Sequence, residues 1–179
     1  MNKIAKKELL ARKFTCIEYM TEYVECFNKM IDSLLIGMGA FQQLQQQNPT
    51  IEAHNFSAWE SRGLPNLEGD RAYAIDALKK AKTGDPSYLS SSAASLRGIS
   101  KDVDNIGGFG EWWQRLDKKY EDDFLLKLKQ AKKIGSNIDY TICGDWLDDE
   151  ILDEEITGSI DETELLNYLK SNENLDDIS

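Results

Sequence analysis

One long apolar pattern near the start of the chain constrains the fold most strongly. Counted in heptads from Ile17, every a and d position up to Phe41 is apolar: Ile17, Met20, Val24, Phe27, Ile31, Leu34, Met38 and Phe41. Residues at this spacing share one side of an α-helix, which we expect over residues 6–46 with a length of about 60 Å. Gly37 and Gly39 each cost about 1 kcal/mol relative to alanine inside a helix, so a break near residue 36 is the alternative.

The apolar stripe on this first helix is wider than a two-stranded coiled coil needs. Leu9, Leu10, Phe14, Cys16, Tyr23, Met30 and Leu35 extend it on both sides. Such a stripe suits a helix that is covered by two or more neighbours. The neighbours belong either to the same chain or to a second copy, in a homodimer through the first helix.

Start and stop signals predict two shorter helices. Asp70 has the position of an N-cap before a helix over 71–83, which carries lysines in its last turn. Pro86 is suited to the first turn of a helix over 86–97, and Gly98 to its end.

A second long helix is predicted over residues 111–134, where apolar residues recur every three or four positions before Gly135. The stretch 48–69 holds two of the three prolines and is expected to be irregular, pinned to the body by its apolar side chains. The fold class is therefore all-α, a helical bundle whose body spans residues 1–135.

The charge of the chain divides sharply along the sequence. Residues 1–134 hold 20 Lys and Arg against 18 Asp and Glu, a net charge of +2. Residues 135–179 hold one basic residue, Lys170, against 14 Asp and Glu, a net charge of −13. This last quarter is unsuited to direct binding of nucleic acid or an anionic membrane, because phosphate contacts need Lys and Arg. It suits a protein partner with a basic surface, or acts only to keep the protein soluble.

The acidic quarter carries the marks of folded helices. Ser159 and Glu162 form a capping box ahead of a leucine stripe, and Asp145 is a suitable N-cap for an earlier helix over 146–156. We therefore expect an acidic helical pair over 145–171, within an appendage of residues 136–179 that packs on the body and frays at its end.

The first helix of this pair combines apolar side chains with carboxylates. Acidic residues around exposed aromatic and aliphatic anchors are typical of a patch that docks on a basic, partly apolar surface, although the apolar ones could equally fill the core. The predicted partner-binding residues are Trp146, Asp148, Asp149, Glu150, Asp153, Glu154 and Glu155.

These features predict a non-catalytic interaction protein. One form is an inhibitor that presents carboxylates where phosphates would lie in a nucleic-acid-binding groove, as phage-encoded anti-defence proteins can do. A regulatory adaptor or a secretion-type chaperone fits the composition equally well.

Two carboxylate pairs support a catalytic alternative. Glu22 with Glu25, and Glu150 with Asp153, each lie on one face of a predicted helix. They resemble the acidic motifs of all-α nucleoside triphosphate pyrophosphohydrolases of the MazG kind. The resemblance implies magnesium-dependent hydrolysis of a nucleotide.

The cysteine and histidine content predicts no cofactor or metal site. Cys16, Cys26 and Cys143 form neither a CxxC pair nor a disulfide framework, and His54 has no partner residues at zinc spacing. Such usage favours a reduced, cytoplasmic setting. The longest nearly apolar run, residues 34–41, is too short to span a membrane.

Overall fold

The computed structural model describes residues 3–51, 55–83, 86–106 and 111–140. Every regular element in these ranges is helical, so the prediction of an all-α bundle is confirmed. The long helices are α1 (Lys3–Gln47), α3 (Leu64–Lys82), α4 (Pro86–Asp104) and α5 (Lys118–Tyr140). The short elements are α2 (Phe56–Ala58), a π-helical turn η1 (Trp59–Gly63) and a 3-10 turn η2 (Glu111–Arg115).

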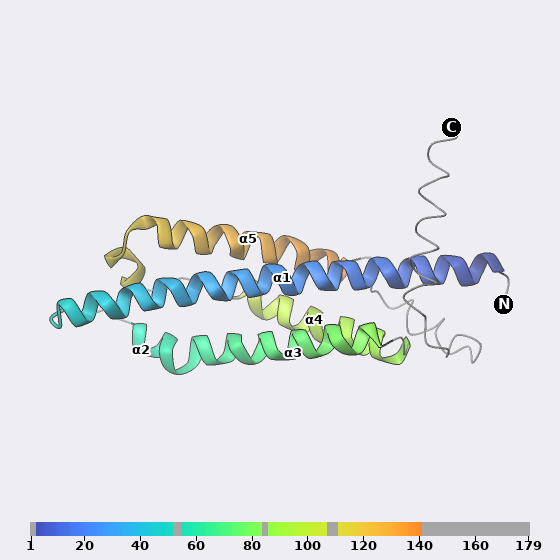
Figure 1. Cartoon of the computed structure of the whole chain (residues 1–179), viewed down its shortest axis with the longest axis horizontal. Helices are drawn as coiled ribbons and strands as arrows, with labels where there is room; N and C mark the ends of the chain where they lie inside the picture. The colour runs from blue at the N-terminus through green and yellow to red at the C-terminus, as the bar shows by residue number, and fades with distance from the viewer. Residues whose placement is uncertain (1–2, 52–54, 84–85, 107–110, 141–179) are drawn as a thin grey trace, which may run out of the picture.

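The four long helices alternate in direction along the molecule (Figure 1). α1 lies in the middle of the view, with α5 on one side and α3 and α4 on the other. α1 packs against α5 and α3, α3 packs against α4, and α4 packs against α5. A ring of neighbours that run in alternating directions is an up-down-up-down bundle, in which apolar stripes meet in one core.

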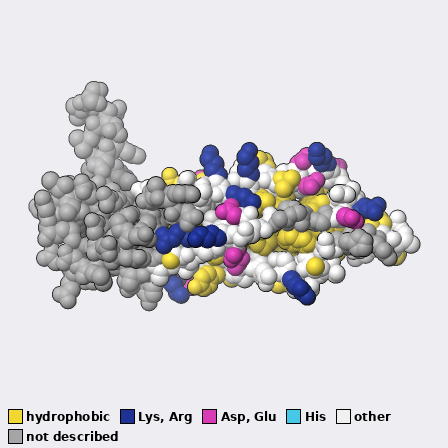
Figure 2. Space-filling view, turned by 180° about the vertical axis from the view of Figure 1, so that it is seen from behind, with side chains coloured by type: hydrophobic (Ala, Val, Ile, Leu, Met, Phe, Trp, Pro, Cys, Tyr) yellow, Lys and Arg dark blue, Asp and Glu magenta, His cyan; other side chains and the backbone are white. Residues whose placement is uncertain are grey.

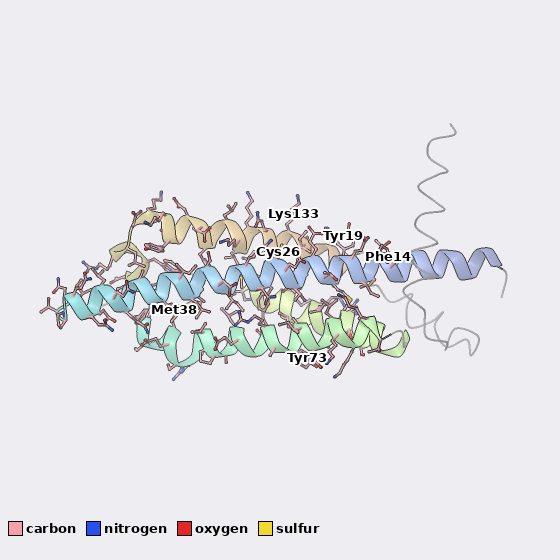
Figure 3. All side chains as sticks on the ribbon, in the orientation of Figure 1. Phe14, Tyr19, Cys26, Met38, Tyr73 and Lys133 are labelled. Atoms are coloured by element: carbon pink, nitrogen blue, oxygen red, sulfur yellow. The ribbon has the colours of Figure 1, made fainter. Side chains whose placement is uncertain are left out.

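The apolar stripe of α1 is buried inside this ring. Seven of its eight predicted a and d side chains, Met20 to Phe41, are buried, and Ile17 packs partly buried against them. Side chains fill the space between α1 and its neighbours on both sides (Figure 3). The described part of the stripe is thus covered within one chain, and a homodimer is not needed to cover it.

α1 runs without a break through both of its glycines. Gly37 is buried beneath the indole ring of Trp113, and a Cβ at residue 37 would lie 2.5 Å from its Cζ3 atom. A Cβ at Gly39 would meet nothing within 4 Å. Gly37 therefore serves the close approach of a tryptophan, and the alternative of a helix end near residue 36 is wrong.

Aromatic rings close the end of the bundle where α1 ends and α5 begins. Phe41 lies 4.4 Å from Phe56 and 5.7 Å from Trp112, measured between ring centroids. Trp112 stacks on Trp113 at 4.2 Å, and Trp113 lies 5.7 Å from Phe124. All five rings are buried. This cluster ties α1, α2, η2 and α5 together, because aromatic pairs add stability beyond their buried area.

The segment before α3 is more regular than the sequence predicts. Residues 48–69 were expected to be irregular, yet α2, η1 and the start of α3 are continuous from Phe56 onward. Pro65 lies in the first turn of α3, where its missing N–H is tolerated. Asp70 is consequently an interior residue of α3, and its predicted role as an N-cap is wrong.

The later helices also differ from their predicted bounds. α4 continues past Gly98 to Asp104, and α5 begins at Lys118 and continues past Gly135 to Tyr140, instead of spanning 111–134. Both glycines were expected to end helices. A Cβ at Gly135 would lie 3.1 Å from Tyr23 Cε2 and would also clash with the side chain of Ser100. Gly135 therefore permits α5 to approach α1 and α4 closely.

The start of α5 depends on a residue that the sequence pattern did not single out. Asp117 precedes the helix, and the backbone N–H of Lys119 donates to its Oδ1 at 3.1 Å. This is an N-cap bond. Residues 111–115 form a separate 3-10 turn because Trp112 and Trp113 both enter the core, which neighbouring positions of an α-helix seldom allow.

Candidate functional site

The predicted docking residues lie outside the described residues, together with the whole predicted helical pair over 145–171. Their predicted role stays a prediction. The residues concerned are Trp146, Asp148, Asp149, Glu150, Asp153, Glu154 and Glu155. His54 also lies outside the described residues.

Of the two carboxylate pairs behind the catalytic alternative, only Glu22 with Glu25 lies in the described part of the chain. Glu22 and Glu25 are exposed on α1. The pKa of the half-buried Cys26 thiol is raised mainly by its own burial, and the negative charges of these two glutamates raise it further. Glu150 and Asp153 lie outside the described residues. Among the described residues, no three His, Cys, Asp or Glu side chains come together as a metal ion would require.

An open groove lies between the start of α3 and the end of α4. Its volume is about 640 Å³. Trp59, Pro65, Leu67 and Ile106 supply apolar and aromatic lining, and Asp70 and Asp102 supply carboxylates. We refer to it as the α3–α4 groove.

The π-helical turn positions the aromatic wall of the α3–α4 groove. The indole of Trp59 lies against the backbone of Gly63, where a Cβ would come within 2.9 Å of the ring atom Cδ2. Because α2, η1 and α3 follow one another without interruption, Trp59 has a fixed position relative to Asp70. A π-turn inserted in a helix often marks a functional position.

The two groove carboxylates repel each other. Burial raises the pKa of Asp70 above its ordinary value of 3.8, and the negative charge of Asp102 raises it further. Within the described residues, neither carboxylate forms a hydrogen bond or an ion pair, unlike Asp32, Asp76, Asp117 and Asp123, each of which has a basic partner within 4 Å. Asp70 and Asp102 thus form an acidic pair that has no cation among the described side chains.

A buried phenol of α1 senses the charges of this pair, although it does not line the groove. Tyr23 of α1 is fully buried, and its hydroxyl has no hydrogen-bond partner in the described part of the molecule. Burial raises the pKa of Tyr23, and the charges of Asp70, Asp104 and Asp102 raise it further. The hydroxyl therefore stays protonated and neutral at physiological pH.

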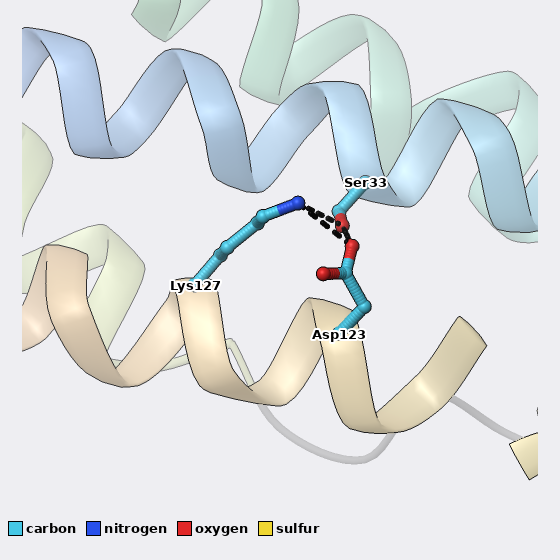
Figure 4. Close-up of polar contacts among 3 residues, drawn as sticks. All are labelled: Ser33, Asp123 and Lys127. Carbon is cyan, nitrogen blue, oxygen red and sulfur yellow. Dashed lines mark hydrogen bonds and ion pairs between the residues drawn. The ribbon is translucent and has the colours of Figure 1, made fainter. Parts of the chain in front are cut away.

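A second polar cluster joins α1 to α5 (Figure 4). The hydroxyl of Ser33 donates to Asp123 Oδ2, and Lys127 Nζ lies 2.8 Å from the same oxygen and 3.3 Å from Ser33 Oγ. The hydrogen bonds from Lys127 and Ser33 hold the pKa of Asp123 below its ordinary value. Asp123 Oδ2, Ser33 Oγ and Lys127 Nζ all bond one another, so the cluster links α1 to α5 at a fixed register.

The cysteines differ from one another. Cys26 is a free thiol, whereas Cys16, buried in the core, is disulfide-bonded. The sequence predicted no disulfide framework, because an odd number of unpatterned cysteines gives no sign of which residues the fold brings together.

The described surface of the body carries both signs of charge. On the face opposite to that of Figure 1, Lys and Arg side chains are interspersed with Asp and Glu side chains (Figure 2). Large apolar side chains that are exposed include Ile36, Tyr73 and Leu126, at 60%, 58% and 56%. None of the described helices has an apolar stretch suited to crossing a lipid bilayer.

Comparison of the chain with protein-family models, curated proteins and solved structures finds no match. The groove itself could not be found from the sequence, because its two carboxylates come from different helices. The one local signal is the spacing of Trp59 and Gly63, which lie one helical turn apart in a segment that was expected to be irregular.

Proposed function

We propose that this protein is a non-catalytic interaction protein, whose acidic last quarter binds a basic surface on a protein partner. The observation that carries the proposal is the charge step from +2 over residues 1–134 to −13 over residues 135–179. A segment with one basic residue and 14 acidic ones attracts a positively charged surface at long range and repels phosphates.

The proposed form is an inhibitor of a nucleic-acid-binding protein. Carboxylates at Asp148, Asp149, Glu150, Asp153, Glu154 and Glu155 would stand in for phosphates, and Trp146 would supply an aromatic anchor of the kind that dominates binding energy at interfaces. A regulatory adaptor or a secretion-type chaperone would use the same surface on a partner that binds no nucleic acid.

The test compares two variants that lose the same charge at different places. The docking variant changes the six carboxylates to Asn or Gln. The control variant makes the same change at six exposed carboxylates of the body, namely Glu18, Glu22, Glu25, Glu68, Glu111 and Asp122. We expect the wild type and the control variant to capture the same partner from native lysate, and the docking variant to lose it.

Competition with duplex DNA separates the inhibitor from the adaptor or chaperone. If the acidic surface occupies a nucleic-acid-binding groove, added DNA releases the captured partner. Retention of the partner at saturating DNA would favour the adaptor or chaperone. Equal capture by the docking variant and the wild type would overturn the whole proposal.

The hydrolase alternative has its own test. Under that alternative, magnesium raises the melting temperature, a panel of nucleoside triphosphates is hydrolysed, and Glu22→Gln abolishes the hydrolysis. Under the proposal made here, the wild type and Glu22→Gln are equally inactive across the panel. Turnover by the wild type that is lost in Glu22→Gln would show the protein to be an enzyme.

A further inference from the structure

The N-terminal part of α1 extends past the rest of the described bundle. It continues as one helix beyond the ends of α3, α4 and α5 (Figure 1). Residues 3–17, which we call the arm of α1, hold five Lys and Arg against one Glu, a net charge of +4. Leu10 lies four residues before Phe14 and seven before Ile17, so by helical spacing it continues the apolar stripe. The arm therefore combines positive charge with an apolar face that needs a cover.

The chain leaves α5 beside this arm. Asp123 on α5 accepts a hydrogen bond from Ser33 on α1. Twelve residues further along α5, Gly135 packs against Tyr23, which lies ten residues before Ser33. The two helices are therefore antiparallel, with nearly equal steps along both. At this register Tyr140, the last residue of α5, is level with the end of the arm that adjoins the bundle.

A disulfide bond ties the arm to another segment of the chain. Cys16 lies on the arm and is disulfide-bonded, whereas Cys26 is a free thiol. Since the chain has three cysteines, a bond within one chain leaves Cys143 as the partner of Cys16. Cys143 follows the end of α5 by three residues, which agrees with the register of α1 and α5.

The segment that follows Cys143 complements the arm in charge and in apolar pattern. Residues 144–179 hold 13 Asp and Glu against one Lys, and Leu165, Leu166 and Leu169 form an apolar stripe among them. An arm of 15 residues is about 22 Å long, so a segment of 36 residues is long enough to follow it. Opposite charges beside facing apolar stripes favour one register of docking over others.

We infer that residues 144–179 pack on the arm of α1 in the same chain, with their carboxylates against its Lys and Arg and their leucines along its apolar face. This contact goes beyond the proposed function, because it needs no partner. A basic partner of the acidic quarter competes with the arm for the same carboxylates.

Carbodiimide cross-linking of the full chain locates the contact, because this reagent joins a carboxylate to an amine only where the two touch. An equal mixture of ¹⁵N-labelled and unlabelled protein separates links within one chain from links between chains. We expect links within one chain from residues 144–179 to the four lysines of the arm, and none to Lys118 or Lys119 at the other end of the bundle. Peptide mapping without reductant should find Cys16 joined to Cys143.

Hydrogen exchange with matched variants measures how strongly the segment is held. Leu10→Gln removes an apolar side chain from the arm and should speed amide exchange in residues 144–171 about tenfold. Ile36→Gln makes the same kind of change at an exposed position of α1 and should leave that exchange unchanged. Exchange of α5 should stay slow in both variants, which shows that the bundle remains folded.

Four results would overturn the inference: links only to lysines outside the arm, links only between labelled and unlabelled chains, a bond from Cys16 to a cysteine other than Cys143, or unchanged exchange in Leu10→Gln. None of them bears on the capture of a partner from lysate, which is measured separately. Conversely, failure to capture a partner would leave the links within one chain intact.

Discussion

Gly37 and Gly39 lie within one turn of each other on α1, yet their surroundings differ. Gly37 lies under the indole of Trp113, whereas Gly39 has open space where a Cβ would go. Sequence reasoning treated both as weak points of the helix, because glycine lacks helix propensity wherever it stands. Only the packing of a tryptophan from a distant segment distinguishes them.

Gly37→Ala and Gly39→Ala are therefore expected to change stability in opposite directions. Alanine gains about 1 kcal/mol of helix propensity at either site, but at residue 37 overpacking against a rigid, buried indole costs about 1–3 kcal/mol. We expect Gly39→Ala to raise the free energy of unfolding by up to about 1 kcal/mol and Gly37→Ala to lower it. Urea denaturation followed by circular dichroism measures both, and stabilisation by Gly37→Ala would contradict the placement of Trp113.

Asp70 gives a pH dependence of definite sign. Its pKa is raised in the folded state, so the folded protein binds the proton more readily than the unfolded chain does. The ionised carboxylate therefore destabilises the fold fully above its folded pKa, and the cost disappears as pH falls below the ordinary value of 3.8. Asp70→Asn should melt higher than the wild type at neutral pH, with the difference shrinking in acid.

The opposite sign is expected for Asp123, which serves as the internal control. Its pKa is lowered by hydrogen bonds from Lys127 and Ser33, so its stabilising contribution is present above the ordinary value of 3.8 and is lost as pH falls through the lowered value. Asp123→Asn should melt lower than the wild type at neutral pH, with the difference shrinking in acid. Thermal melts of both variants across this range would contradict the account if their differences had the same sign.

At the scale of elements, the sequence predicts which segments are helical better than where they begin and end. The heptad pattern of α1 predicts both its existence and its buried face, because that pattern is local and long. The bounds of α3, α4 and α5 depend on contacts between segments: Gly135 meets Tyr23 and Ser100, so a residue that usually ends a helix lies inside one. The groove carboxylates escaped prediction for the same reason.

The N-cap of α5 is the element-scale feature that is simplest to test. Asp117→Ala removes the acceptor for the Lys119 backbone N–H and should lower the free energy of unfolding by about 1 kcal/mol. Asp122→Ala, an exposed change within the same helix, should alter it by no more than about 0.5 kcal/mol. Equal effects of the two changes in urea denaturation would show that Asp117 does not act as a cap.

At the scale of the whole molecule, the chain combines a helical bundle of mixed surface charge with an acidic last quarter. The bundle buries the described part of the α1 stripe within one chain, and its α3–α4 groove is lined by Asp70, Asp102 and Trp59. In the proposed function the acidic last quarter attracts a basic partner, and charge attraction of this kind acts mainly on specificity and on the rate of association. Added salt should therefore weaken the complex through screening.

The most direct test of this account measures the dissociation constant of the captured partner as a function of salt concentration. The wild type is compared with the docking variant, in which the six carboxylates from Asp148 to Glu155 are changed to Asn or Gln, and with the charge-matched control variant. We expect binding of the wild type and the control variant to weaken steeply as salt rises, and binding of the docking variant to be weak and nearly independent of salt. Tight, equally salt-dependent binding by all three proteins would contradict the claim that the acidic quarter is the docking surface.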